Sequence, residues 1–290
     1  MNRFYAYINL VRLNQPVGIF LLYLPCLYGI FLSATIFNDI AWNIIFKTST
    51  LFFIGSVLMR SAGCIVNDLL DQKIDQKVYR TKNRPIASKK ISNSEAIIIL
   101  TILLIFSFLI LIRFNLATII SGFIVLILVI LYPLMKRITN YPQLFLGLTF
   151  NYGLLMSSFA LISKINISIL ITYFSCVVWT IIYDTIYGFQ DIKDDIKIGI
   201  RSSSISLSKN FKNPKIALYV LAILMFFCFI LVGHINNFST SFSLLILLTH
   251  LFLIFQIKFC KINEPKSCLL FFKRNIIFGI LILISLIFEK

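Results

Sequence analysis

Acidic residues are scarce in this chain, which has 11 Asp and Glu against 27 Lys and Arg in 290 residues. Charged residues make up only 13% of the sequence, and hydrophobic residues make up 59% of it. This composition excludes an ordinary soluble globular protein, in which about a quarter of the residues are charged. The net charge of +16 would suit a nucleic-acid-binding protein, but basic loops on one side of a membrane explain it more simply.

Paired cysteine motifs are also absent. The six cysteines form no CxxC pair, and most of them lie in or beside apolar runs, which favours buried small side chains over zinc ligands or disulfides. The two histidines, His234 and His250, are single and far from the polar clusters, so we assign them no function. Oxygen groups remain as the candidates for any metal site.

What the chain has in abundance is apolar runs of about 20 residues, each long enough to cross the roughly 30 Å hydrocarbon layer as a helix. We predict an all-α membrane protein, with nine transmembrane helices in a bundle and a single domain over residues 1–290. The predicted spans are 17–36, 43–66, 96–112, 117–134, 143–162, 168–190, 215–233, 240–257 and 273–288.

The distribution of basic residues predicts the orientation of the bundle. The N-terminal segment and the loops after the second, fourth, sixth and eighth spans hold 22 of the 27 Lys and Arg, when those at the first residues of the following spans (Lys215, Lys273 and Arg274) are counted with the loops. The opposite loops and the C-terminus hold three. Because basic loops stay in the cytoplasm, we expect the N-terminus and the two long polar loops on that side.

The first acidic cluster, motif one, covers 67–75 at the end of the second span. Arg60, Asn67 and Asp71 are spaced i, i+7, i+11, which places them on one stripe of a helix, and Asp75 extends that stripe by a turn. Arg60 lies inside an apolar run, where an ionisable side chain is costly and is a functional candidate by default. We expect these side chains to point together at the cytoplasmic end of the helix.

The second cluster, motif two, covers 184–195 and lies four spans later. Asp184, Asp191 and Asp195 repeat the spacing i, i+7, i+11. Because four helices return the chain to the same side, we predict two similar four-helix halves around a cytoplasm-facing cavity, related by an axis along the membrane normal. Acids that merely pair with nearby Lys and Arg at helix ends are the alternative, and the matched positions of the two clusters argue against it.

Carboxylates packed this closely repel one another unless cations lie between them. Clusters of oxygen ligands without His or Cys select hard cations, and Mg²⁺ typically binds one or two carboxylates together with substrate phosphates. Arginine forks combined with metal ions are the usual way to bind a diphosphate. The basic residues close to the clusters are Arg80, Lys82, Arg84, Lys136, Arg137, Lys193, Lys197 and Arg201.

Three motifs resemble those of the UbiA family of membrane aromatic prenyltransferases. The segment from Asn67 to Arg84 fits the family signature N-xxx-D-xx-I-D-xx-V-x-R-T-xx-R, and YDTIYGFQDIKDDIKIGIRSSS looks like its second Asp-rich motif. The stretch YPLMKRITNYPQLFLG, from Tyr132 to Gly147, resembles the corresponding part of the family's 4-hydroxybenzoate polyprenyltransferases. The similarity covers most of residues 10–205.

The resemblance implies a Mg²⁺-dependent enzyme of ubiquinone biosynthesis. It would transfer the polyprenyl group of a polyprenyl diphosphate to 4-hydroxybenzoate, at the ring carbon ortho to the hydroxyl. Two Mg²⁺ ions would bridge the diphosphate. The enzyme would lie in a bacterial or mitochondrial inner membrane with its active site facing the cytoplasm, surrounded by lipid. The resemblance implies neither a nucleic-acid partner nor an obligatory protein partner.

Residue by residue, the resemblance assigns roles within the motifs. Asp71, Asp191 and Arg137 would be catalytic, with Asp191 orienting or deprotonating the phenol. Arg60 or Arg137 would pair with the benzoate carboxylate. The implied metal ligands are Asn67, Asp71, Asp191 and Asp195, with Asp68 and Asp75 completing the shell, and the implied substrate-binding residues are Arg60, Arg80, Arg84, Lys136, Arg137 and Lys197.

Two stretches depart from the family pattern. Asn14 and Gln15 replace its usual acidic–basic pair near the first span, and Phe150–Gly153 reads FNYG where relatives commonly carry Trp. Both concern the acceptor region, so another aromatic acceptor, such as dihydroxynaphthoate or a porphyrin, remains an alternative. A cation-coupled transporter is a more distant one, because it would place its charges near the bilayer midplane rather than at helix ends.

Overall fold

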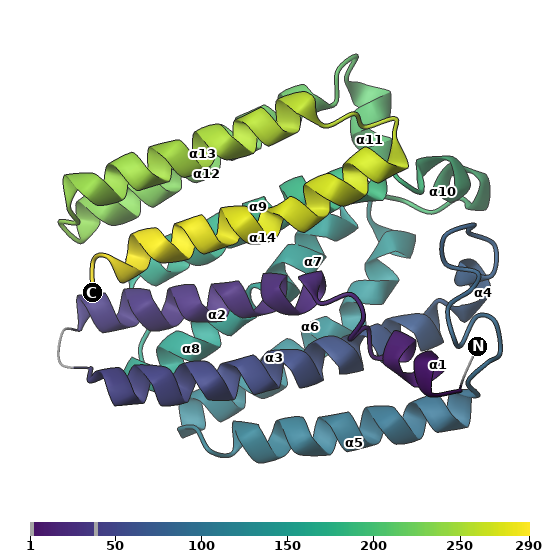
Figure 1. Cartoon of the computed structure of the whole chain (residues 1–290), viewed down its shortest axis with the longest axis horizontal. Coiled ribbons are helices and arrows are strands. Elements are labelled where there is room, and N and C mark those ends of the chain that lie inside the picture. The colour runs from purple at the N-terminus through teal and green to yellow at the C-terminus, as the bar shows by residue number, and fades with distance from the viewer. Residues whose placement is uncertain (1–2, 38–39) are drawn as a thin grey trace.

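The computed structural model describes residues 3–37 and 40–290, except for the side chain of Lys136. Within these residues all regular secondary structure is helical (Figure 1). The helices are α1 (Arg3–Leu10), α2 (Val17–Ile36), α3 (Trp42–Leu70), α4 (Gln72–Asp75), α5 (Asn93–Leu111), α6 (Leu116–Ile138), α7 (Pro142–Phe150), α8 (Tyr152–Ile162), α9 (Ile167–Gly188), α10 (Ile192–Ile198), α11 (Ser203–Asn210), α12 (Lys215–Ile235), α13 (Thr240–Phe259) and α14 (Pro265–Ile287).

Nine segments of the described chain are long and apolar enough to cross a membrane, which confirms the predicted fold class. The fifth is formed by α7 and α8 together. The ninth begins at Pro265, earlier than the predicted residue 273, because proline is well suited to the first turn of a helix. Lys273 and Arg274, with which the predicted span begins, lie instead within the first half of α14.

The long helices lie side by side, and α4, α10 and α11 gather at one end of the bundle (Figure 1). Behind this end, α2, α9 and α14 share a buried core. The hydroxyl of Tyr28 donates to the carbonyl oxygen of Gly279 over 2.7 Å, and the indole nitrogen of Trp179 donates to Asn275 over 2.8 Å. These bonds satisfy polar groups that have no water to bond in the bilayer. They join α14 to α2 and to α9.

The two Asp-rich motifs share one local backbone geometry. Asp71 follows α3 with φ −99° and ψ 6°, and Asp191 follows α9 with φ −105° and ψ 1°. The carbonyl of each accepts the amides three and four residues later, which starts the short helices α4 and α10. The two acids therefore lie at matched breaks between a long and a short helix, which corrects the expectation that each stripe continues along one helix.

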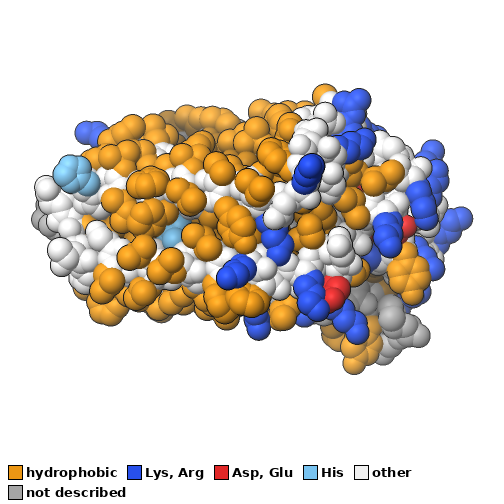
Figure 2. Space-filling view, turned by 90° about the horizontal axis from the view of Figure 1, so that it is seen from above, with side chains coloured by type: hydrophobic (Ala, Val, Ile, Leu, Met, Phe, Trp, Pro, Cys, Tyr) orange, Lys and Arg blue, Asp and Glu red, His pale blue; other side chains and the backbone are white. Residues whose placement is uncertain are grey.

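The surface agrees with a chain that spans a membrane. Figure 2 shows a hydrophobic surface over most of the molecule on the face in view, with Lys and Arg gathered mainly toward one end. Five of the six cysteines are buried and Cys228 is half-buried, as expected of small apolar side chains. The protein is thus an integral membrane protein with one strongly basic end.

Candidate functional site

A cavity of about 1190 Å³ opens between the helices and contains parts of both Asp-rich motifs. Its walls come from α2, α3, α5, α6, α7, α8, α9 and α14. One face of α3 lines it at every turn from Phe52 to Asp71, so polar groups of motif one surround one end and apolar groups surround the other. Ligand pockets usually measure about 300–1,000 Å³, so this cavity has room for a large ligand with a polar head.

Asp68 and Asp75 of motif one are buried and bound by arginines. Arg12 donates from Nη2 to both carboxylate oxygens of Asp68, over 3.0 and 2.8 Å. Arg84 donates from Nη1 to Asp68 over 3.1 Å and to Asp75 over 2.8 Å. Burial lowers the pKa of Arg84, but the charges of Asp68 and Asp75 outweigh it and raise the pKa overall. The arginine therefore stays charged and holds two acids together.

Asp71 and Asn67 occupy the wall of the cavity itself. They lie one turn apart at the end of α3, and the Asp71 side chain is only 1% exposed. Arg137 lies 3.8 Å from the carboxylate of Asp71 and donates to the carbonyl of Leu70 over 3.1 Å. These contacts place an amide oxygen and a carboxylate at the polar end, as the helical spacing predicts.

Motif two meets motif one through the segment that follows α4. Arg80 binds Asp191 through two nitrogens, at 2.9 Å from Nε and 2.5 Å from Nη2, and donates to the hydroxyl of Tyr187 over 2.9 Å. The backbone amide of Tyr79 donates to Asp194 over 3.1 Å. Burial lowers the pKa of Arg80, but its hydrogen bond to Asp191 raises the pKa overall. The two motifs are therefore joined by a charged bridge.

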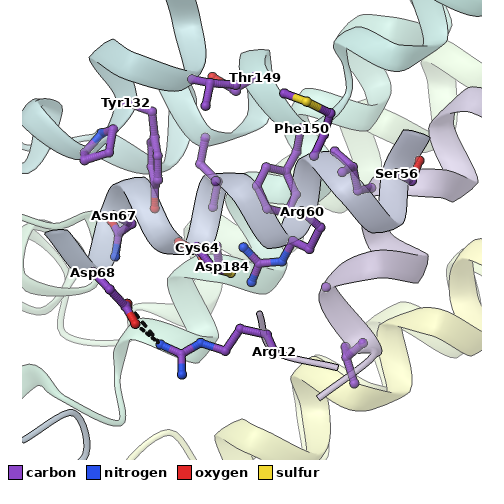
Figure 3. A pocket seen from close by; sticks show the side chains of 18 of the residues that line it. Arg12, Ser56, Arg60, Cys64, Asn67, Asp68, Tyr132, Thr149, Phe150 and Asp184 are labelled. Atoms are coloured by element: carbon purple, nitrogen blue, oxygen red, sulfur yellow. Dashed lines mark hydrogen bonds and ion pairs between the residues drawn. The ribbon is translucent and has the colours of Figure 1, made fainter. Parts of the chain in front are cut away.

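Arg60 lies in the middle of the cavity wall, between the polar and apolar ends. Its guanidinium carbon is 5.3 Å from the centre of the Phe150 ring, a cation–π contact. A Cβ atom on Gly18 would lie 2.4 Å from Arg60 Nε, so the missing side chain there makes room for the arginine. Among the described residues Nε is buried without a hydrogen-bond partner. Figure 3 shows Arg60 beneath the Phe150 ring and the Arg12–Asp68 pair toward Asn67.

Two cavity residues were given no role from the sequence. Arg12 has a left-handed backbone, with φ 58°, and no local pattern indicated that it would reach Asp68. Asp184 belongs to motif two but received no role, and it lines the cavity next to Gln143. In the sequence, the stretch around Arg12 differs from the family pattern at Asn14 and Gln15, and nothing there indicates a role for Arg12 itself.

Some of the expected substrate-binding residues lie away from this cavity. Lys197, on α10, is exposed and does not line it, and the side chain of Arg137 is half exposed near its rim. The side chain of Lys136 lies outside the described part of the chain. Arg60, Arg80 and Arg84 do line the cavity, together with Arg201 and Lys273.

The donor groups fit a metal ion that binds together with a phosphate ligand. In the described part of the chain, no three Asp, Glu, His or Cys side chains form a cage that could hold an ion alone. Asn67 and Asp71 line the cavity on one side, and Asp191 and Asp195 line it from the other motif. Mg²⁺ usually takes only one or two carboxylates and completes its shell with waters and substrate phosphates, so these residues suit it.

Comparison with known proteins gives a consistent result. The sequence model of the UbiA prenyltransferase family matches residues 22–281. The chain is 37% identical to a 4-hydroxybenzoate octaprenyltransferase of Vesicomyosocius okutanii, over 96% of this chain and 98% of that one. It is 39% identical to a mitochondrial 4-hydroxybenzoate polyprenyltransferase of Dictyostelium discoideum, of whose length it covers 61%. It is 38% identical to the human protein of the same name, over 97% of this chain and 74% of that one.

Solved structures share the fold at lower identity. A UbiA homologue from Aeropyrum pernix matches with a TM-score of 0.74 and 20% identity, over 93% of this chain and 97% of that one. A UbiA homologue from Archaeoglobus fulgidus, solved with GPP and Mg²⁺, matches with a TM-score of 0.73 and 17% identity. The match covers 98% of this chain and 99% of that one.

Proposed function

The chain belongs to the UbiA prenyltransferase family, and on that premise we propose that it transfers a polyprenyl group from polyprenyl diphosphate to the ring of 4-hydroxybenzoate in ubiquinone biosynthesis. Relatives named for this activity support the acceptor, because they are 34–38% identical over at least 96% of this chain. The observation that carries the proposal is the cavity, which combines two carboxylate motifs, an arginine bridge and a long apolar end.

The polar end would bind the diphosphate. Asn67, Asp71, Asp191 and Asp195 would hold two Mg²⁺ ions, with Asp68 and Asp75 supporting them. Bound Mg²⁺ would neutralise charge on the leaving diphosphate. Arg80 and Arg84 already hold acids of both motifs at this end, and their remaining N–H groups are placed to donate to diphosphate oxygens. Arg137 would add positive charge at the rim, and the exposed Lys197 would attract the diphosphate from outside the cavity. Lys136 stays a proposed substrate-binding residue.

The aromatic acceptor would bind between Arg60 and the polar end. Its carboxylate would pair with Arg60, whose position beneath Phe150 leaves a buried N–H group for an anion. Arg137 is the less favoured partner because it already contacts Leu70 and Asp71. The acceptor hydroxyl would then face motif two, where Asp191 orients the phenol and takes its proton.

Bond breaking and bond making follow from this arrangement. The allylic carbon–oxygen bond breaks, and its electron pair leaves with the diphosphate. The ring carbon ortho to the hydroxyl attacks the allylic carbon. The proton on that ring carbon then passes to water or to the released diphosphate, and the phenolate recovers its own proton from Asp191. The apolar walls exclude water, which would otherwise capture the allylic cation. We place the active site on the cytoplasmic side of an inner membrane, because the basic end of the bundle carries it.

An assay of the purified protein tests the proposal directly. The protein is incubated with labelled polyprenyl diphosphate, Mg²⁺ and 4-hydroxybenzoate, and the prenylated acid is separated by chromatography. We expect product that disappears when EDTA is added. Turnover of dihydroxynaphthoate with none of 4-hydroxybenzoate would overturn the acceptor, and uptake of a cation by proteoliposomes without any prenylated product would favour a transporter.

A further inference from the structure

The apolar end of the cavity is long enough to hold most of a prenyl chain. The face of α3 that lines it includes Met59, then the adjacent pair Ser56 and Gly55 about one turn away, then Phe52 about one turn further on. At 1.5 Å per residue, Gly55 lies about 24 Å along the helix from Asp71. The hydrocarbon layer is about 30 Å thick, so the cavity follows the helix across most of the membrane.

Two aromatic rings close the far end. Phe52 and Phe114 both line the cavity, and their ring centres are 5.1 Å apart. The cavity also reaches the lipid-facing surface between α5 and α6. There Phe108 and Phe123, whose ring centres are 6.4 Å apart, both line it while 47% and 53% exposed. A chain that reaches Phe52 and Phe114 must therefore turn sideways between α5 and α6.

Gly55 is the last open position on α3 before this wall. It lines the cavity, and a Cβ atom added there would meet no atom within 4 Å. Alanine would stabilise the interior of a helix better than glycine does. Glycine at position 55 therefore lowers the stability of the helix but keeps the adjacent part of the cavity open. Gly63 is equally open, but it lies one turn from Asn67 and so beside the expected diphosphate.

From this arrangement we propose that Gly55 is a specificity-determining residue, the passage through which long prenyl chains reach the Phe52–Phe114 wall and the lipid. The inference rests on the proposed function. A long chain needs the space at Gly55, whereas a chain of two isoprene units bound at Asp71 ends well before it. A side chain at position 55 therefore excludes long chains and leaves short ones unaffected.

A graded series of substitutions tests the passage. Gly55→Ala, Gly55→Val and Gly55→Leu are assayed with geranyl diphosphate and with an all-trans octaprenyl diphosphate, each with 4-hydroxybenzoate. We expect kcat/KM for the long substrate to fall stepwise along the series, by at least tenfold in Gly55→Leu. The value for geranyl diphosphate stays within about twofold. Gly55→Ala improves helix propensity, so at least one member of the series remains folded.

Two further variants separate blockage from damage to the helix. Ile54→Phe adds bulk at the adjacent residue, which is 43% exposed and does not line the cavity, so the preference between the two substrates should not change. Adding Phe52→Ala to Gly55→Leu reopens space one turn away and should restore long-chain turnover. An unchanged ratio in Gly55→Leu, or an equal loss for both substrates, overturns the inference. No turnover of either substrate by the unmodified protein would instead overturn the proposed function.

Discussion

At the scale of the residue, Arg60 combines a charge with a position deep in the cavity. A guanidinium in such a place is costly unless an anion or an aromatic face compensates for it. Phe150 supplies the aromatic face. Arg137, the other candidate for the acceptor carboxylate, is half exposed and engaged with the end of α3. The structure thus separates two arginines that the sequence left as equal alternatives.

We predict that Arg60→Ala raises KM for 4-hydroxybenzoate by about 10- to 100-fold, because a hydrogen bond to a charged group contributes about 1.5–3 kcal/mol. KM for the prenyl diphosphate should change little. The decisive measurement repeats the assay with the methyl ester of 4-hydroxybenzoate, which carries no carboxylate. An equal loss with the ester, or a larger effect from Arg137→Ala, would contradict the assignment.

At the scale of the element, the end of α3 carries two neighbouring acids with different surroundings. Asp68 binds Arg12 and thereby fastens the segment after α1 to α3, where Ser61 also donates to the carbonyl of Val11 over 3.1 Å. Both acids line the cavity, but Asp71 lies 3.8 Å from the half-exposed Arg137 of the rim. One acid therefore supports the structure around the motif, and the other is placed to act on a ligand.

This difference gives a paired prediction. Asp68→Asn should lower the thermal stability of the detergent-solubilised protein, because breaking a buried ion pair typically costs about 3–5 kcal/mol. Asp71→Asn should leave the melting temperature nearly unchanged and reduce kcat by 100-fold or more. Thermal unfolding and the prenyl transfer assay on both variants check it. Equal losses of stability would show that the two acids have the same role.

The helices themselves could be predicted from the sequence, whereas their breaks could not. Apolar runs of membrane length are a local signal, and all nine were placed correctly except for the start of α14. The breaks after Leu70 and Gly188 depend on backbone bonds to Asp71 and Asp191 that hydropathy does not record. The reach of Arg12 to Asp68 spans 56 residues and depends on tertiary packing. The spacing of the acids nevertheless predicted one shared cavity, which residues of both motifs line.

At the scale of the whole molecule, charge asymmetry and site position belong together. The basic end of the bundle carries both Asp-rich motifs and the arginines that bridge them. A soluble diphosphate head and a benzoate would approach this end from water, while the prenyl chain enters from the lipid. The basic loops that we predict to orient the protein in the membrane would therefore also surround the proposed site of the two anionic substrates.

The orientation can be measured with single cysteines and a membrane-impermeant maleimide. Lys89 lies in the loop after α4, Lys164 lies between α8 and α9 at the opposite end, and both are exposed. Five of the six native cysteines are buried, so background labelling should be low, and the unmodified protein measures it. We expect Lys164→Cys to react in intact cells and Lys89→Cys to react only in inverted vesicles. The reverse pattern would place the active site outside the cytoplasm, since the cavity opens on the side of Lys89.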